Sequence, residues 1–192
     1  MKSSTYTEEH VNQQVFHTEL LPHNAALYSF AYRLTGGNAA KAKDLVQETY
    51  EKAWRFVERY TPGTNARAWL FRICHHAFIN EWRKVRNQPA KVGLETVGGI
   101  QTDAQPDYSQ MGDEVMNAIN NLPAQQRVVL LLDLEDFTYE EIAAVLNIRI
   151  GTVRSRLHRA RKTLSVCLCL YAADLGYGMA DIAAGVDASD DQ

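Results

Sequence analysis

The sequence lacks long hydrophobic runs, and its 192 residues include only three cysteines and five prolines. No apolar run approaches the roughly 18 residues that a membrane-spanning helix requires. Residues 1–10 contain no hydrophobic segment of the kind found in signal peptides. The cysteines, Cys74, Cys167 and Cys169, provide no disulfide framework. We therefore expect a protein of the reducing cytoplasm that does not insert into membranes.

The sequence also has little net charge, formally -3, because 20 basic residues nearly balance 23 acidic ones. The charges are unevenly distributed, however. Residues 20–88 contain 11 basic and 5 acidic residues, and residues 149–162 contain 6 basic residues and no acidic one. The intervening segment 89–115 is acidic, and residues 163–192 contain 5 acidic residues and no basic one. This distribution is compatible with DNA binding by separate basic surfaces.

Almost every periodic segment predicts a helix, and no stretch shows the strict alternation that is typical of a strand. The expected helices span about 27–34, 38–60, 66–86, 113–122, 125–134, 138–146 and 150–169. The glycine- and proline-containing stretch 87–112 has no sustained period and is too long for a loop inside one compact domain. We therefore predict an all-α fold of two small helical domains joined by a flexible linker. The predicted divisions are an N-terminal extension (1–19), a first domain (20–88), a linker (89–112), a second domain (113–165) and an acidic tail (166–192).

Residues 139–158 have the pattern of a helix-turn-helix. Thr138 and Glu141 fit a capping box that begins the first helix. Asn147 stands in the turn, where a residue that tolerates a left-handed backbone is required. Apolar residues then recur at helical spacing and are expected to face inward, namely Val153, Leu157 and Ala160.

The helix that follows this turn carries six cations and no acid between residues 149 and 162. With the apolar residues facing inward, the outward set is Thr152, Arg154, Ser155, His158, Arg159 and Lys162, with Arg156 and Arg161 on the flanks. Forked donors, short hydroxyls and flanking cations are the groups that a recognition helix brings to a major groove. The alternative is a solvated basic face, and the helix-turn-helix context favours DNA contact.

Residues 65–86 alternate cations with aromatic residues, a combination that suits melted or single-stranded DNA. Trp69, Phe78 and Trp82 are better explained as core residues. The polar residues expected at the surface, with a DNA role, are Arg72, His76, Asn80, Arg83 and Lys84.

The segment 38–60 has an acidic and polar stripe, formed by Asp44, Gln47, Glu48 and Glu51 at helical spacing opposite Leu45 and Val46. Because an acidic surface repels DNA, this acidic stripe suggests a basic protein partner. An ordinary solvated helix face is the alternative on the residues alone.

Together these segments resemble the extracytoplasmic-function (ECF, group four) RNA polymerase sigma factors of the sigma-70 family, over about residues 20–165. Residues 44–54 (DLVQETYEKAW) resemble the sigma-two stretch that docks on the beta-prime clamp helices. Residues 68–73 (AWLFRI) resemble the start of the helix used in minus-ten recognition and melting. Residues 122–129 (LPAQQRVV) resemble the sigma-four helix near the beta-flap contact. Residues 142–143 and 151–161 (GTVRSRLHRAR) match the minus-thirty-five reader.

The resemblance implies that residues 20–88 form sigma-two, that residues 113–165 form sigma-four, and that the protein directs core RNA polymerase to promoters. Implied partners are the polymerase (beta-prime clamp helices and beta flap), promoter DNA and an anti-sigma factor; no cofactor, metal or catalytic step is implied. The implied minus-thirty-five contacts are Arg149, Thr152, Arg154, Ser155, Arg156, His158, Arg159 and Lys162. The implied minus-ten contacts are Asn65, Arg67, Arg72, His76, Asn80, Arg83 and Lys84. The turn 60–65 would capture a flipped base, and the acidic stripe becomes the polymerase-docking surface.

The chain departs from the family pattern at two points. His76 stands where the family most often has Asn, and Asn80 where it often has Asp. Both side chains still form hydrogen bonds, so the minus-ten preference stays open. In the helix-turn-helix, 147–149 replaces a more usual turn with Gly and Pro, and Arg149 adds a cation beside the groove.

Two alternative functions fit parts of the sequence. A response-regulator type of transcriptional regulator has a similar C-terminal helix-turn-helix, but it requires an N-terminal receiver with alternating strands. A metal- or redox-sensing DNA-binding protein would use the ligand types in 74–76 or the pair Cys167 and Cys169. Three consecutive helical residues cannot all face one metal, and no second pair of cysteines closes a zinc site.

Overall fold

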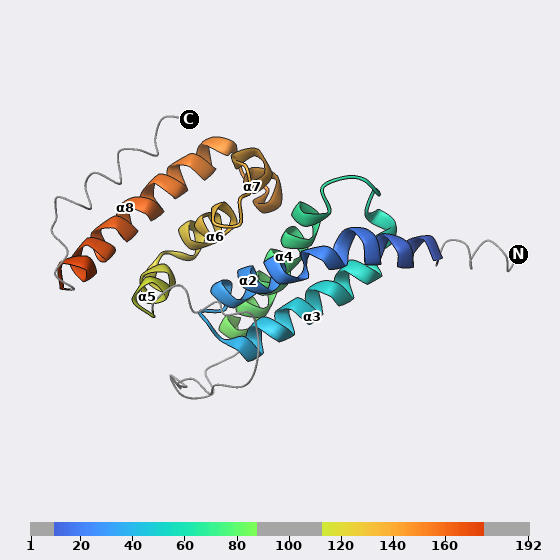
Figure 1. Ribbon diagram of the computed structural model, residues 1–192, viewed down its shortest axis with the longest axis horizontal. Coiled ribbons are helices and arrows are strands. Elements are labelled where there is room, and N and C mark those ends of the chain that lie inside the picture. The colour runs from blue at the N-terminus through green and yellow to red at the C-terminus, as the bar shows by residue number, and fades with distance from the viewer. Residues whose placement is uncertain (1–9, 88–112, 175–192) are drawn as a thin grey trace, which may run out of the picture.

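The structure is a computed structural model, and it describes residues 10–87 and 113–174, where every regular element is a helix. The predicted all-α class is confirmed. The N-terminal helical group contains η1 (Phe16–Leu20), η2 (Leu21–His23), α2 (Asn24–Leu34), α3 (Ala39–Arg55), η3 (Val57–Arg59) and α4 (Ala66–Asn87). The C-terminal helical group contains α5 (Asp113–Asn121), α6 (Ala124–Asp133), α7 (Tyr139–Leu146) and α8 (Ile150–Asp174), as Figure 1 shows. The predicted linker (89–112) and most of the predicted acidic tail (166–192) lie outside the described residues.

Local signals account for most helix boundaries. The Oδ1 atom of Asn38 accepts a hydrogen bond from the backbone nitrogen of Lys41 (2.9 Å), which caps α3. The helix ends at Arg55 rather than near Tyr60, because the chain tightens into the 3-10 turn η3. Before α3, Gly36 and Gly37 adopt φ angles of 74° and 84°, which are left-handed and suit glycine.

The helix-turn-helix has the predicted local geometry. Thr138 and Glu141 form both hydrogen bonds of a capping box at the start of α7. Asn147 ends α7 with φ 53° and ψ 51°, the left-handed conformation predicted for the turn. Helix α8, the second helix of this motif, begins at Ile150 and continues to Asp174, five residues beyond its predicted end at Cys169.

The extension before the first predicted domain packs onto the N-terminal helical group. Residues 10–15 are helical and continue into η1 and η2. Leu20 is fully buried, and the ring of Phe16 lies 5.3 Å from that of Trp54 and 5.7 Å from that of Tyr50, between centroids. Aromatic pairs at this separation stabilise packing. The described part of the extension therefore belongs to the same packed unit as α3.

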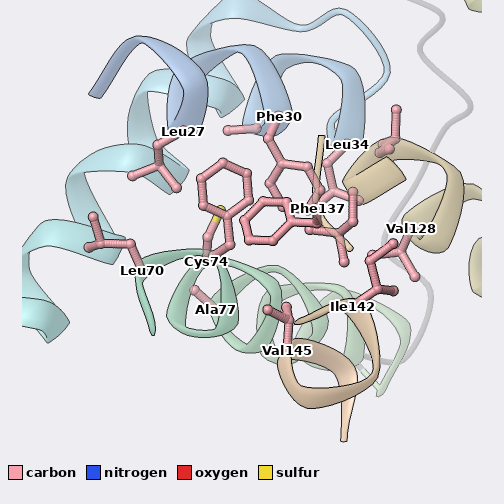
Figure 2. Packing of buried hydrophobic residues seen from close by; sticks show 14 of the residues in the cluster. Leu27, Phe30, Leu34, Leu70, Cys74, Ala77, Val128, Phe137, Ile142 and Val145 are labelled. Atoms are coloured by element: carbon pink, nitrogen blue, oxygen red, sulfur yellow. The ribbon is translucent and has the colours of Figure 1, made fainter. Parts of the chain in front are cut away.

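The two helical groups also pack against each other. Helix α4 contacts α7, α2 contacts α6, and one cluster of buried hydrophobic residues extends across both groups. In Figure 2 this cluster brings Leu27, Phe30 and Leu34 of α2 close to residues of α4, α6 and α7. Phe137, which precedes α7, packs with its ring centroid 4.9 Å from that of Phe71 on α4. This arrangement positions the predicted DNA-binding residues of α4 beside the second group.

Candidate nucleic-acid interface

Helix α8 buries its predicted inner face and displays its cations. Val153, Leu157 and Ala160 are at most 1% exposed, so the predicted orientation of the helix is confirmed. The predicted contact residues lie on the outer side: Arg149, Arg154, His158, Arg159 and Lys162 are exposed, and Thr152, Ser155 and Arg156 are half-buried. The outer face of α8 therefore has the shape and charge of a major-groove reader.

The cations of α8 differ in how they are held. Arg156 donates to Oε1 of Gln125 (2.7 Å), and Arg161 pairs with Asp133 (3.0 Å), which fixes these flanking side chains against α6. The side chains of Arg154, His158 and Lys162 form no hydrogen bond or ion pair with any described part of the chain. These three donors are therefore available to an external acceptor.

The predicted contacts at the start of α4 are occupied by the C-terminal helical group. The Oδ1 atom of Asn65 caps α4 by accepting from the backbone of Ala68 (2.9 Å), and its Nδ2 atom donates to Oε1 of Glu141 (2.5 Å). Arg67 donates to the backbone carbonyl of Glu135, and Arg72 donates to that of Ala144. These three of the seven predicted minus-ten residues thus contact groups that lie at least 68 positions further along the chain.

Glu135 is the centre of this contact. It is 8% exposed and accepts a hydrogen bond from Arg33 (2.8 Å), and its other carboxylate oxygen lies 3.6 Å from Arg67. Burial raises the pKa of Glu135, although Ser29, Arg33 and Arg67 act in the opposite direction. The guanidinium of Arg67 also lies over the ring of Phe137, 4.4 Å from its centroid. No sequence signal marked Glu135, because it follows an apolar helix and its partners are distant in the chain.

Further along α4, the predicted contacts His76, Asn80 and Arg83 are exposed, as expected, and Lys84 has no described side chain. His76, Asn80 and Arg83 line a cavity of about 480 Å³ between α4 and α6. Burial, with smaller contributions from Arg72 and Lys52, lowers the pKa of His76. At neutral pH this imidazole is therefore uncharged, and it offers one donor and one acceptor. Of the aromatic residues predicted to be core, Trp69 and Phe78 are half-buried.

The acidic stripe lies on one side of α3, away from the core. Asp44, Gln47 and Glu51 are exposed, whereas Leu45 is 1% exposed. Glu48 is half-buried and pairs with Lys52 (2.6 Å), and Gln47 donates to Oε1 of Glu51 (3.0 Å). The four residues therefore form one continuous polar surface, opposite the face that packs on α2 and α4.

The alternative functions find little support in the described residues. Within 10–87 there is no strand, whereas a receiver domain alternates strands and helices. No group of three or more metal-ligating side chains occurs among the residues that the structure describes. Burial raises the pKa of Cys74 to about 12, which disfavours the thiolate form that binds metals. Nor is any described helix long and apolar enough to cross a membrane.

Sequence reasoning also missed Glu19. This residue lies in the extension, yet its carboxylate accepts hydrogen bonds from the hydroxyl of Tyr60 (2.5 Å) and the backbone nitrogen of Gly63 (2.9 Å). Glu19 thereby contacts the turn predicted to capture a flipped base. The sequence carried no signal for it, because a single acidic residue at a separation of 41 positions forms no local pattern.

Comparison with known proteins defines the class to which this fold belongs. Residues 21–88 match the model of Sigma-70 region 2, and residues 112–164 match that of Sigma-70, region 4. The chain is 34% identical, over 150 residues, to the ECF RNA polymerase sigma factor EcfG of Rhodopseudomonas palustris, covering 78% of this chain and 82% of that protein. It is 35% identical over 158 residues to the ECF RNA polymerase sigma factor SigE of Mycolicibacterium smegmatis, covering 79% of this chain but only 61% of that longer protein.

Solved structures agree with this class. The sigma factor RpoE in complex with the anti-sigma factor NepR, from Bartonella quintana, matches with a TM-score of 0.65 and 34% sequence identity, over 80% of this chain and 96% of that chain. The fold is also similar to that of CnrH, solved with the cytosolic domain of CnrY (TM-score 0.57, 24% identity, 83% of this chain and 88% of that chain). The chain belongs to the ECF RNA polymerase sigma factors, the transcription initiation factors that read promoters. The resemblance stated from the sequence is thereby confirmed.

Proposed function

We propose that α8 reads the minus-thirty-five element of the promoters to which this chain directs core RNA polymerase. The observation that carries this proposal is the outer face of α8, where Arg154, His158 and Lys162 are free of partners within the described residues. Arginine is the usual bidentate donor to guanine, and exposed cations neutralise phosphates. Arg149, Arg159 and the half-buried Thr152, Ser155 and Arg156 complete the contact surface.

The minus-ten element is read, in this proposal, by the N-terminal helical group. His76, Asn80, Arg83 and Lys84 lie along α4 after the occupied set of Asn65, Arg67 and Arg72. Cations and polar side chains along one helix suit the backbone of a melted strand, and the turn 60–65 takes an unpaired base. The occupied residues reach DNA only after their contacts with Glu135, Glu141 and Ala144 break.

The partners follow from the surfaces and the relatives. The acidic stripe on α3 fits a basic protein surface, which in this family is the clamp-helix region of the beta-prime subunit, and α6 approaches the beta flap. An anti-sigma factor is a further partner, because the similar sigma factor RpoE was solved with the anti-sigma factor NepR. We place the protein in the cytoplasm, where the polymerase acts, and give it no catalytic step of its own.

Reconstitution with core RNA polymerase tests the function directly. We expect the purified chain to direct run-off transcripts from a defined set of genomic promoters, whereas core polymerase alone yields none above background. Sequencing of the transcript starts should reveal shared minus-thirty-five and minus-ten elements. Core polymerase that gains no promoter-specific transcripts from the chain would contradict the proposed function.

Charge reversal of the acidic stripe tests its docking role. In a double variant, Asp44→Arg and Glu48→Arg, like charges would face the basic partner surface. We expect affinity for core polymerase to fall by about 100-fold or more, since such juxtaposition costs several kcal/mol. A matched control reverses two acids away from α3, Glu81→Arg and Glu140→Arg, and should retain binding. Equal co-purification of both variants with core polymerase would remove the docking surface from the proposal.

A further inference from the structure

The turn proposed to capture the minus-ten base is held by a carboxylate from outside the matched sigma region. Sigma-70 region 2 begins at residue 21, and Glu19 precedes it. One carboxylate oxygen of Glu19 (Oε2) accepts both the Tyr60 hydroxyl (2.5 Å) and the Gly63 backbone nitrogen (2.9 Å). Tyr60 begins the turn and Gly63 lies inside it, so a single side chain ties two points of the turn to η1.

Other contacts keep this turn in one conformation. Tyr60 is 5% exposed, and its hydroxyl, which donates to Glu19, also lies 3.0 Å from the backbone carbonyl oxygen of Thr64. Its ring lies 5.1 Å from that of Trp69, between centroids. Gly63 has a φ of 78°, a left-handed conformation that other residues adopt with strain. The hydrogen bonds from Tyr60 and Gly63 lower the pKa of Glu19, so its carboxylate is ionised at neutral pH.

Between η1–η2 and the start of α4 lies an open cavity of about 500 Å³, which we call the turn cavity. One wall comes from Thr18, Glu19, Pro22 and His23, and the other from Thr64, Asn65, Ala66 and Arg67. Its volume is within the range of about 300–1,000 Å³ that is typical of small-molecule sites, so a single nucleobase fits. Burial and the nearby Arg67 lower the pKa of His23, which leaves the imidazole neutral as a donor and acceptor in this wall.

We infer that Glu19 is a positioning residue for minus-ten base capture: it anchors the turn 60–65, so that this turn and the extension together form a cavity of fixed shape for one unpaired base. The inference rests on the proposed function and deepens it. It assigns to Thr18 and Glu19 of the extension, which the sequence left without a role, part of one wall of the base-binding site. Asn65 lines the same cavity and becomes available to the base when it releases Glu141.

The test compares four variants in reconstituted holoenzyme: Glu19→Ala, Glu19→Gln, Tyr60→Phe and Gln14→Ala. Glu19→Ala removes the acceptor, and Tyr60→Phe removes one donor while Gly63 remains bonded. Gln14→Ala is the control, an exposed position in the helical stretch that precedes η1. Strand opening is measured by permanganate reactivity of minus-ten thymines, and base preference by transcription from promoters with each minus-ten base substituted in turn.

We expect Glu19→Ala to reduce strand opening by about tenfold, because charge-assisted hydrogen bonds are lost. Its discrimination among minus-ten bases should fall as well, while affinity for core polymerase stays unchanged. Tyr60→Phe should show a smaller loss of the same kind, and Gln14→Ala none. Glu19→Gln, which keeps an acceptor oxygen, should recover part of the loss.

Two results would overturn the inference. The first is a Glu19→Ala holoenzyme that opens promoters and discriminates minus-ten bases like wild type. The second is a Glu19→Ala chain with a lower melting temperature but an unchanged base preference, which would make Glu19 merely structural. Both are distinct from failure of the proposed function, in which the wild-type chain itself would yield no promoter-specific transcripts with core polymerase.

Discussion

The two helices proposed to read DNA differ in what their arginines contact. On α8, Arg154 points away from the molecule and has no partner among the described residues. On α4, Arg67 and Arg72 donate to backbone carbonyls of the C-terminal helical group. In this arrangement, therefore, the proposed minus-thirty-five reader is displayed, whereas three of the seven proposed minus-ten contacts are engaged within the chain. Under the proposed function, Arg67 and Arg72 reach DNA only when these two contacts break.

The contact between the groups depends more on apolar packing than on charge. Phe71 and Phe137 are both buried, and their rings are 4.9 Å apart. By contrast, burial raises the pKa of Glu135 in spite of its two arginine neighbours. Desolvation therefore disfavours the charged carboxylate more than the nearby arginines favour it. We therefore expect buried hydrophobic side chains to stabilise the contact between the groups, and the ion pairs of Glu135 to contribute little to its stability. The following three predictions test the contact between the groups and the difference between the two proposed readers, beginning with the largest effect.

Removal of the Phe137 ring should weaken the contact most. Phe137→Ala takes away a 4% exposed ring that packs on Phe71 and lies beneath Arg67. We expect the free energy of unfolding to fall by about 3–5 kcal/mol, as for other buried phenylalanines, and the radius of gyration in solution scattering to increase. The control is Leu134→Ala, at a 42% exposed position directly after the end of α6. If Phe137→Ala unfolds the chain altogether, Phe137→Leu provides a milder test of the same change in radius.

Arginine substitutions on the two helices should affect different steps. Arg154→Ala should weaken binding to duplex promoter DNA by about 1–3 kcal/mol, as expected for loss of a bidentate base contact. Arg72→Ala should leave binding to the minus-thirty-five element unchanged and should act at strand opening. Band-shift titrations with the minus-thirty-five duplex, and permanganate reactivity for the minus-ten region, separate the two steps. Equal effects of both substitutions in both assays would remove the distinction between the readers.

Neutralising Glu135 should have the smallest effect on the free energy of unfolding. The size of this effect should depend on pH. The folded-state pKa of Glu135 is raised above its unfolded value. Between the unfolded pKa, about 4.3, and the higher folded pKa, the folded state binds more protons than the unfolded state. The contribution of Glu135 to stability therefore falls as pH rises through this range. We expect Glu135→Gln to remove that pH dependence and to change stability at pH 7 by only about 1 kcal/mol, because glutamine keeps an acceptor oxygen for Arg33. Denaturant unfolding of both proteins between pH 4 and pH 7 measures this, and a large loss of stability at pH 7 would show that the ion pairs hold the contact.

Features that depend on neighbours in the chain could be predicted. The capping box of Thr138 and Glu141 and the left-handed turn at Asn147 depend on residues a few positions apart, and the structure has both. The inward set of α8 follows from the helical period, and all three residues are buried. In these cases local propensity and burial pattern point to the same structure.

Contacts between distant segments could not be predicted in the same way. Arg67 was predicted to face DNA, but its acceptor is a backbone carbonyl 68 residues away, and no composition or period encodes that pairing. In the sequence, Glu19 is indistinguishable from other surface acids, because its hydrogen bond with the amide of Gly63 exists only in the folded chain. Whether a cation or carboxylate is buried depends on which helices pack against each other. Such packing joins segments that are distant in sequence, so local sequence patterns do not predict it.

The length of α8 has an electrostatic consequence. The matched Sigma-70 region 4 ends at residue 164, but the helix continues to Asp174, the first acidic residue after the basic block that ends at Lys162. Twelve helical residues separate the backbones of these two positions by about 18 Å, at 1.5 Å per residue. This is about twice the screening distance of roughly 8 Å at physiological ionic strength. The continuous helix thus acts as a spacer, which places the backbone at residue 174 beyond the screening distance from that of Lys162.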